Sequence, residues 1–245
     1  MKFEETIKKI SAIVASFVVF FFAASIYLSA KGFIMHNGQI VLTNSADART
    51  IKEDLSTGNS KKNLDAFVPP KGNILGDEKA PVTMYEYSSL GCSHCADFHL
   101  SALPKIKKEL IDTGKLNFVF ADFPLDRNSL RASMLARCMP KDKYFDFLNL
   151  LFKKQRDWHP LKKPQKILLE YAALNGLSKE DALKCMKSDT AAKDLDDIRQ
   201  QAFTYLGLEG TPSFLLVHKD SKQLFHGAPS YGEIKEFIND KLGNQ

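Results

Sequence analysis

Two cysteines separated by two residues, Cys92 and Cys95, constrain the fold of this chain more than any other feature. They follow an apolar stretch at residues 82–87 that predicts a strand, and the residues after them predict a helix. The first turn of a helix offers unpaired N–H groups and the positive end of the helix dipole, both of which favour a thiolate. Because only the thiolate attacks a disulfide, this placement predicts a redox site.

The alternative for this spacing is half of a zinc site, which would need two further ligands. The other two cysteines, Cys138 and Cys185, do not form a second pair of the same spacing, and no histidine pair follows at zinc-finger spacing. Zinc is therefore the less favoured interpretation, and a redox site needs neither a metal nor an organic cofactor. His94, between the two thiols, could add a positive charge or a hydrogen bond to the Cys92 thiolate.

The N-terminus decides the expected compartment. Residues 10–30 carry no formal charge, and as a helix these 21 residues would span about 31 Å, enough for the core of a bilayer. A cleavable signal peptide usually has a shorter apolar core and an A-x-A-like cleavage site, of which residues 28–30 are a poor version. We therefore expect residues 1–31 to be an uncleaved anchor, with a signal peptide as the alternative.

Charge and cysteine content agree with export. Three lysines precede the apolar run and two basic residues, Lys31 and Arg49, follow it, a bias that favours an N-terminus inside and a domain outside. An even number of cysteines fits an exported domain, because disulfides persist in the periplasm or outside the cell but rarely in the cytosol. The net charge of +5 is mixed with acidic residues and no nucleic-acid motif is present, so nucleic acid is not an expected partner. The expected location is the periplasm, with residues 10–30 in the inner membrane.

The rest of the chain predicts a polar tether at residues 32–72 and one α/β domain at residues 73–245. A strand at 82–87, a helix at 93–113 and a strand at 116–120 predict a parallel pair with a right-handed crossover. The apolar face expected for that helix consists of Phe98, Leu100, Leu103, Ile106 and Leu110.

Helical periodicity then covers residues 131–206, and strands return after it. Trp158 and His159 are expected on a loop within this helical block. Helices are expected at 130–139, 143–156, 166–175, 190–205 and 230–242, and one more is expected to begin after Ser178 as its N-cap. Strands at 213–218 and 223–226 are expected to form a hairpin.

The order of these elements resembles a thioredoxin fold with a helical insertion, at about residues 128–207, between its βαβ and ββα halves. Residues 80–87, followed by the Cys-x-His-Cys motif, resemble the opening of the DsbA-like family of exported thiol–disulfide oxidoreductases. The stretch Gly-Thr-Pro-Ser-Phe at residues 210–214 resembles that family's cis-proline loop, at the expected place before the hairpin.

This resemblance implies roles for particular residues. Cys92 would be the nucleophile and Cys95 the resolving thiol, while Thr211 and a cis Pro212 would hold the substrate backbone. Glu86, near the end of the first strand, matches a family acid that is thought to shuttle protons near the buried thiol.

Two further assignments follow from the same comparison of patterns. Lys115, at the edge of the second strand, could be the partner of Glu86. Cys138 and Cys185 resemble the second, non-catalytic disulfide of some DsbA-like branches, with two reduced thiols as the alternative. The partners implied are unfolded or reduced exported proteins and a DsbB-type membrane reoxidase.

The expected function is therefore an exported oxidoreductase that introduces disulfides into periplasmic proteins. Thr211 departs from the valine that oxidases of this family often carry before the proline, and threonine is familiar in the related isomerases. A reductase or isomerase of the same fold is thus the first alternative. A tethered module that binds zinc or unfolded chains is the second.

Overall fold

The computed structural model describes residues 33–36, 39–42, 64–219 and 221–243. The chain divides into two compact units, residues 1–61 and residues 62–245. In the first unit, β1 (Phe33–His36) pairs antiparallel with β2 (Gln39–Leu42), within the segment predicted as a polar tether. The apolar run at residues 10–30 lies outside the described residues. Among the helices that are described, none has the length and apolar character needed to cross a membrane.

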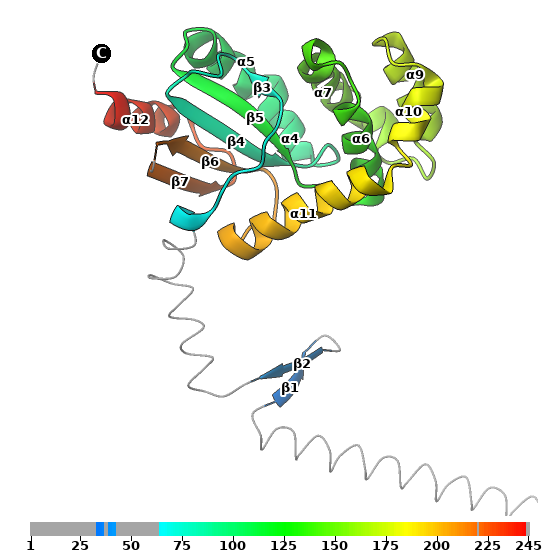
Figure 1. Ribbon diagram of the computed structural model, residues 1–245, viewed down its shortest axis with the longest axis horizontal. Helices are drawn as coiled ribbons and strands as arrows, with labels where there is room; N and C mark the ends of the chain where they lie inside the picture. Colours follow the sequence, from blue (N-terminus) through cyan, green and yellow to red (C-terminus); the bar gives the residue numbers. More distant parts are fainter. Residues whose placement is uncertain (1–32, 37–38, 43–63, 220, 244–245) are drawn as a thin grey trace, which may run out of the picture. The chain divides into compact units, whose positions relative to one another are not determined.

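A five-stranded sheet forms the centre of the second unit, in the order β3-β5-β4-β6-β7 (Figure 1). β4 and β5 run parallel, as the predicted crossover requires, and the other neighbours pair antiparallel. The predicted strands are confirmed, whereas β3, only two residues long, was not predicted. The strands are β3 (Ile74–Leu75), β4 (Val82–Ser88), β5 (Leu116–Asp122), β6 (Ser213–His218) and β7 (Ser221–His226).

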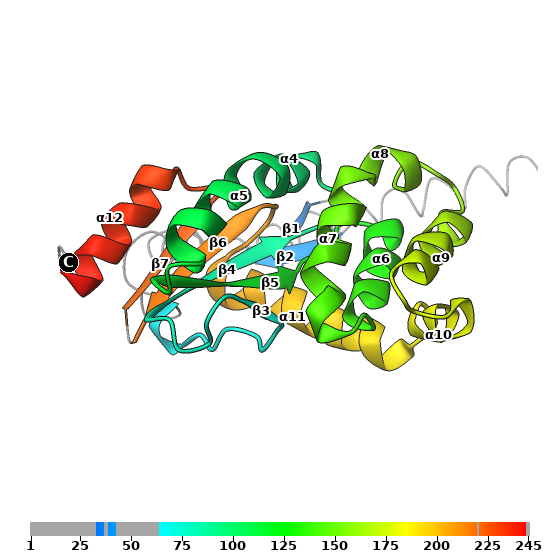
Figure 2. The same cartoon turned by 90° about the horizontal axis from the view of Figure 1, so that it is seen from above.

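Side chains alternate between the two faces of this sheet, as the pleat of a strand dictates. Met84 and Phe214 belong to a core under the helix run that follows β4 and under α12 (Tyr231–Leu242). Tyr87 and Leu215 belong to a second core, on the face that α11 (Asp189–Leu206) covers. Figure 2 shows the resulting three layers, with α4, α5 and α12 on one side of the sheet and α11 on the other.

The helix run after β4 is less regular than predicted. It consists of α4 (Ser93–Asp97), a π-helical turn, α5 (Leu103–Ile106) and a second π-helical turn that ends at Ile111. Pro104 has no N–H to donate to the carbonyl four residues earlier, and the N–H of Leu103 bonds instead to the carbonyl of Phe98, five residues back. Leu100 is 46% exposed, so the prediction that it faces the core is wrong. At about 100° per residue it lies about 200° around the helix from Phe98, on the solvent side.

The helical insertion lies between β5 and β6, beside one end of the sheet (Figure 2). The single helix expected at 143–156 is two helices, because the backbone at Lys154 leaves the helical conformation (φ −102°, ψ 14°). Trp158, expected on a loop, ends the second of them and is fully buried. The helices before α11 are α6 (Arg127–Arg137), α7 (Tyr144–Lys153), α8 (Gln155–Trp158), α9 (Gln165–Leu174) and α10 (Lys179–Cys185).

Candidate active site

The two thiols of the Cys-x-x-Cys motif lie at the N-terminus of α4. At such a position the first cysteine is expected to be accessible and the second buried. Cys92 is the N-cap residue, with extended backbone angles, and its side chain is partly exposed. Cys95 is fully buried one turn later. Both are free thiols in this structure. A second thiol or thiolate can therefore reach Cys92 but not Cys95.

The surroundings of the two sulfurs push their pKa values apart. A hydrogen bond from the Cys95 thiol lowers the pKa of Cys92 to about 5, with partial burial acting against it. The Thr211 side chain and the backbone N–H groups of Cys95 and His94 also lower this pKa. The same hydrogen bond, burial and the negative charge of Glu86 raise the pKa of Cys95. Cys92 is thus the thiolate at neutral pH and Cys95 keeps its proton.

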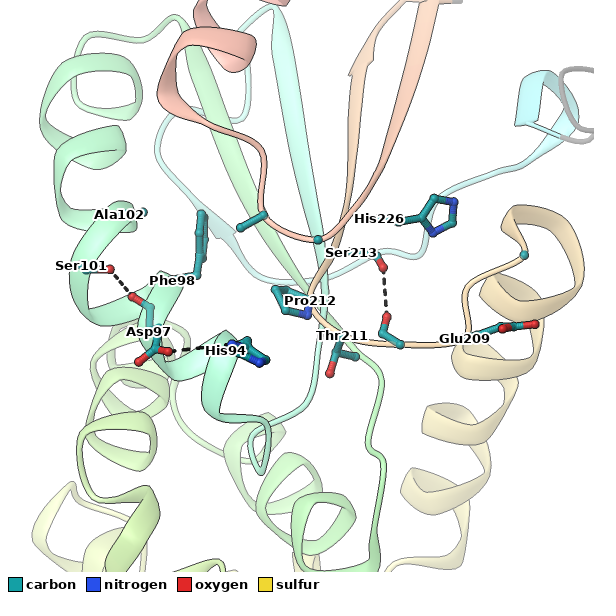
Figure 3. Close-up of a pocket in the computed structure, with 14 residues that line it drawn as sticks. His94, Asp97, Phe98, Ser101, Ala102, Glu209, Thr211, Pro212, Ser213 and His226 are labelled. Atoms are coloured by element: carbon teal, nitrogen blue, oxygen red, sulfur yellow. Dashed lines mark hydrogen bonds and ion pairs between the residues drawn. The ribbon is translucent and has the colours of Figure 1, made fainter.

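His94 contributes through its backbone N–H, whereas its ring is largely exposed to solvent at the edge of the site. The side chain is 82% exposed and lies 4.0 Å from the carboxylate of Asp97 (Figure 3). The expectation that the ring itself stabilises the thiolate stays a prediction.

The Thr211–Pro212 peptide bond is cis, and the loop that contains it lies against Cys92. The Cys92 sulfur is 3.4 Å from the carbonyl oxygen of Thr211, to which Cys92 donates only in its protonated form. The hydroxyl of Thr211 is also buried, and this side chain lowers the pKa of Cys92. The structure therefore joins two motifs that are 119 positions apart in the sequence.

A pocket of about 770 Å³ extends from this loop (Figure 3). Apolar groups, including Phe98 and Pro212, contribute much of its lining. Its charged and titratable groups are His94, Asp97, Glu209 and His226. A pocket of this kind, next to the accessible sulfur, has the room and the surface to hold a segment of another chain.

Glu86 is fully buried on β4, and its partner is a residue that the sequence analysis missed. Its Oε2 atom lies 2.7 Å from Nε2 of His99, which is also buried. The predicted partner, Lys115, is wrong: the parallel register places Glu86 beside Phe120, while Lys115 precedes β5 at the opposite end and is exposed. His99 follows Cys95 by four positions, the spacing of one helix face, and that signal could have identified it.

A second missed residue, Gln155, holds the backbone around the nucleophile. From α8 it donates hydrogen bonds to the carbonyl oxygens of Leu90 (2.8 Å) and Cys92 (2.9 Å). His159, one residue beyond α8, lies against Gly91, so closely that a Cβ added to this glycine would be 2.3 Å from Nε2 of the histidine. No local sequence pattern indicates these contacts, because 63 positions separate Gln155 from Cys92.

Outside the thiol pair, the structure forms a disulfide between Cys138 and Cys185, with Cα atoms 6.3 Å apart. It links the end of α6 to the end of α10 within the insertion. As for metal ions, no group of three or more His, Cys, Asp or Glu side chains in the described part of the chain is arranged to hold one.

Comparisons with known proteins agree with this geometry. The family model described as thioredoxin matches residues 69–240. The crystal structure of Wolbachia pipientis alpha-DsbA1 superimposes with a TM-score of 0.64 at 31% identity, covering 74% of this chain and 96% of that one. Oxidised BdbD from Bacillus subtilis, at 24% identity and a TM-score of 0.62, covers 71% of this chain and 94% of that chain, and shares the fold.

Sequence relatives carry corresponding names. Disulfide bond formation protein D of Bacillus subtilis is 28% identical over 177 residues, which are 69% of this chain and 76% of that protein. A Rickettsia typhi protein, provisionally named a protein-disulfide oxidoreductase, is 29% identical over 75% of this chain and 68% of its own length. A Rickettsia prowazekii protein of the same provisional name is 31% identical over 58% of this chain, and this chain spans about half of it, 53%. The chain therefore belongs to the thioredoxin family, in its DsbA-like branch of protein-disulfide oxidoreductases.

Proposed function

We propose that this protein is an exported disulfide donor, which oxidises pairs of thiols in other proteins by exchange at Cys92 and Cys95. The observation that carries the proposal is the pKa of Cys92, about 5, beside a buried Cys95. A thiolate that is stabilised in the dithiol form favours the reduced enzyme, and this makes the corresponding disulfide oxidising, a relation known for DsbA itself.

The proposed reaction has two steps. In the first, a substrate thiolate attacks the Cys92 sulfur of the Cys92–Cys95 disulfide, and Cys95 leaves as a thiolate and takes up a proton. In the second, another thiolate of the substrate attacks the substrate sulfur of this mixed disulfide, and Cys92 leaves as a thiolate. The substrate loses two electrons and two thiol protons and gains a disulfide. Cys95 ends as a thiol with one of these protons, and the other passes to the solvent, because Cys92 ends as a thiolate. The low pKa of Cys92 makes it a better leaving group than a thiolate of ordinary pKa, which favours the second step.

The pocket beside Pro212 is the proposed site for the substrate chain. It is lined largely by apolar groups, and one of its lining residues, Thr211, contacts the Cys92 sulfur through its carbonyl oxygen. These features suit an extended, unfolded segment that carries a reduced cysteine. Substrates would then be unfolded or reduced exported proteins, and a DsbB-type membrane protein would take the electrons.

The proposed location rests on the sequence. Residues 10–30 would anchor the chain in the inner membrane, residues 32–72 would act as the tether, and residues 73–245 would work in the periplasm.

A second candidate function is that of a reductase or isomerase, and Thr211 is the observation that favours it. The residue before the proline is in contact with the reactive sulfur, and here it is not the valine that is frequent in the oxidases. The same site would then be kept in the dithiol form by a reducing partner.

The reduction potential of the Cys92–Cys95 pair separates these functions. It can be measured on the full-length protein by equilibration with reduced and oxidised glutathione. A potential near or above that of the glutathione couple supports the disulfide donor. A potential near that of thioredoxin would rule the donor out and favour the reductase.

A further inference from the structure

We propose that His99 relays protons between Glu86 and the solvent during thiol–disulfide exchange, through a cavity that shares no lining residue with the pocket beside Pro212. This inference rests on the exchange reaction at Cys92 and Cys95, and it adds a route for the proton of the buried thiol.

A route is needed because Cys95 is fully buried. When a substrate thiolate breaks the Cys92–Cys95 bond, Cys95 leaves as a thiolate in a place that water does not reach. Burial and the charge of Glu86 raise the pKa of Cys95, so this thiolate takes up a proton at once. In the return reaction the Cys95 thiol gives the same proton back before its sulfur forms the disulfide.

The carboxylate of Glu86 is arranged to serve two groups. Its Oε2 atom lies 2.7 Å from Nε2 of His99. Its Oε1 atom is buried and has no hydrogen-bond partner among the described residues. One oxygen is therefore engaged with the histidine, while the other is free to hold the proton that is exchanged with Cys95.

His99 connects this buried carboxylate to the surface. Its ring lies 4.2 Å from that of Phe152, centroid to centroid, and also packs against the rings of Phe118 and Phe120, which exclude water from the Glu86 side. The same histidine lines a cavity of about 190 Å³, and the exposed residues Lys107, Asp146 and Asn149 line its outer part.

Other titratable groups surround the pair but do not provide this connection. Tyr144 on α7 is buried, and its pKa is raised first by burial and then by Asp122, so it keeps its proton. Asp122 on β5 is held 2.8 Å from Nε of Arg137 on α6. Neither Tyr144, Asp122 nor Arg137 lines the cavity. At the cavity itself, Lys107 and Asp146 are solvated surface groups, which leaves His99 as the group in contact with both the carboxylate and the cavity.

The relay predicts a kinetic effect that depends on pH. For the full-length protein, we would measure the rate at which dithiothreitol reduces the Cys92–Cys95 disulfide and the rate at which glutathione disulfide restores it, between about pH 5 and 8, where histidines exchange protons. His99→Phe keeps an aromatic ring among the surrounding phenylalanines, and His99→Gln keeps an N–H donor for Glu86. Both variants should slow the two reactions about tenfold or more and flatten their pH dependence.

Chemical rescue separates proton relay from packing. In His99→Gly the missing ring leaves space that adjoins the cavity, and added imidazole should restore much of the lost rate, while the wild-type rate stays unchanged. His218→Gln, at the far end of β6, is the matched control for the loss of a histidine and should behave as the wild type does. Wild-type rates and pH profiles in His99→Phe and His99→Gln, or a slow His99→Gly that imidazole does not accelerate, would overturn the relay. The reduction potential tests the proposed direction of electron flow independently of these rates, so either proposal can fail alone.

Discussion

The sulfur of Cys92 lies 3.4 Å from the carbonyl oxygen of Thr211, and the buried hydroxyl of the same threonine helps to lower the pKa of Cys92 to about 5. Thr211→Val removes this hydroxyl at nearly constant shape. The pKa of Cys92 should therefore rise. The pKa can be followed through the ultraviolet absorbance of the thiolate. Thr211→Ser keeps the hydroxyl and is the matched control; an equal or lower pKa in Thr211→Val would contradict the assignment.

Gln155 should stabilise the fold through its two hydrogen bonds to the Cys92 loop. Gln155→Leu leaves the carbonyl oxygen of Leu90 without its donor, while that of Cys92 keeps the N–H of Ala96. We expect the free energy of unfolding to fall by about 1–3 kcal/mol, the usual cost of an unsatisfied buried group. Urea denaturation of the reduced protein measures it. Gln165→Leu, at an exposed position of α9, is the control and should change stability by less than about 0.5 kcal/mol.

The Cys138–Cys185 disulfide should contribute stability without affecting the reactive thiols. It joins residues 47 positions apart, and the chain-entropy model gives about 4 kcal/mol for a loop of this length. The double variant Cys138→Ala/Cys185→Ala should unfold at a lower urea concentration, while the pKa of Cys92 stays the same. If denaturation were unchanged, this bridge would not constrain the unfolded chain.

The reduced protein should lose stability, relative to the oxidised protein, as the pH falls from about 9 to about 5. The folded state lowers the pKa of Cys92 from 9.0 to about 5, so unfolding takes up a proton within this range. The contribution is complete above pH 9 and lost at pH 5. Cys95, whose pKa is raised, has an effect only above about pH 9. Denaturation of both redox forms across this range measures the difference, and a constant difference would argue against a stabilised thiolate.

Much of the fold could be predicted because its signals are local. Strands β4, β5 and β6 are apolar runs, and Ser178 caps α10 through the N–H of Asp181, as its position before a helix suggests. β3 could not be predicted, since two residues carry no periodicity and its pairing with β5 is tertiary. Leu100 was assigned to the core because it is apolar, although its position two residues after Phe98 puts it on the opposite side of a helix.

The residues of the candidate site also fall into those with a local sequence signal and those placed only by tertiary packing. Cys92, Cys95 and Pro212 lie in recognisable motifs, and their proximity follows once the fold is inferred. Lys115 was chosen as a charge near the right strand, but the sequence did not show which end of β5 lies beside Glu86. Gln155 had no signal at all, because its hydrogen bonds exist only after the insertion has packed against the Cys92 loop.

Where the chain enters the second unit, Lys222 on β7 donates hydrogen bonds to the carbonyl oxygens of Leu64 (3.2 Å), Asp65 (2.7 Å) and Phe67 (2.8 Å). Lys222 pairs with Val217, whereas the end of β7 near the Pro212 loop is His226. A mechanical pull on the residues before Leu64 would thus be borne by the edge strand, at the end remote from Cys92.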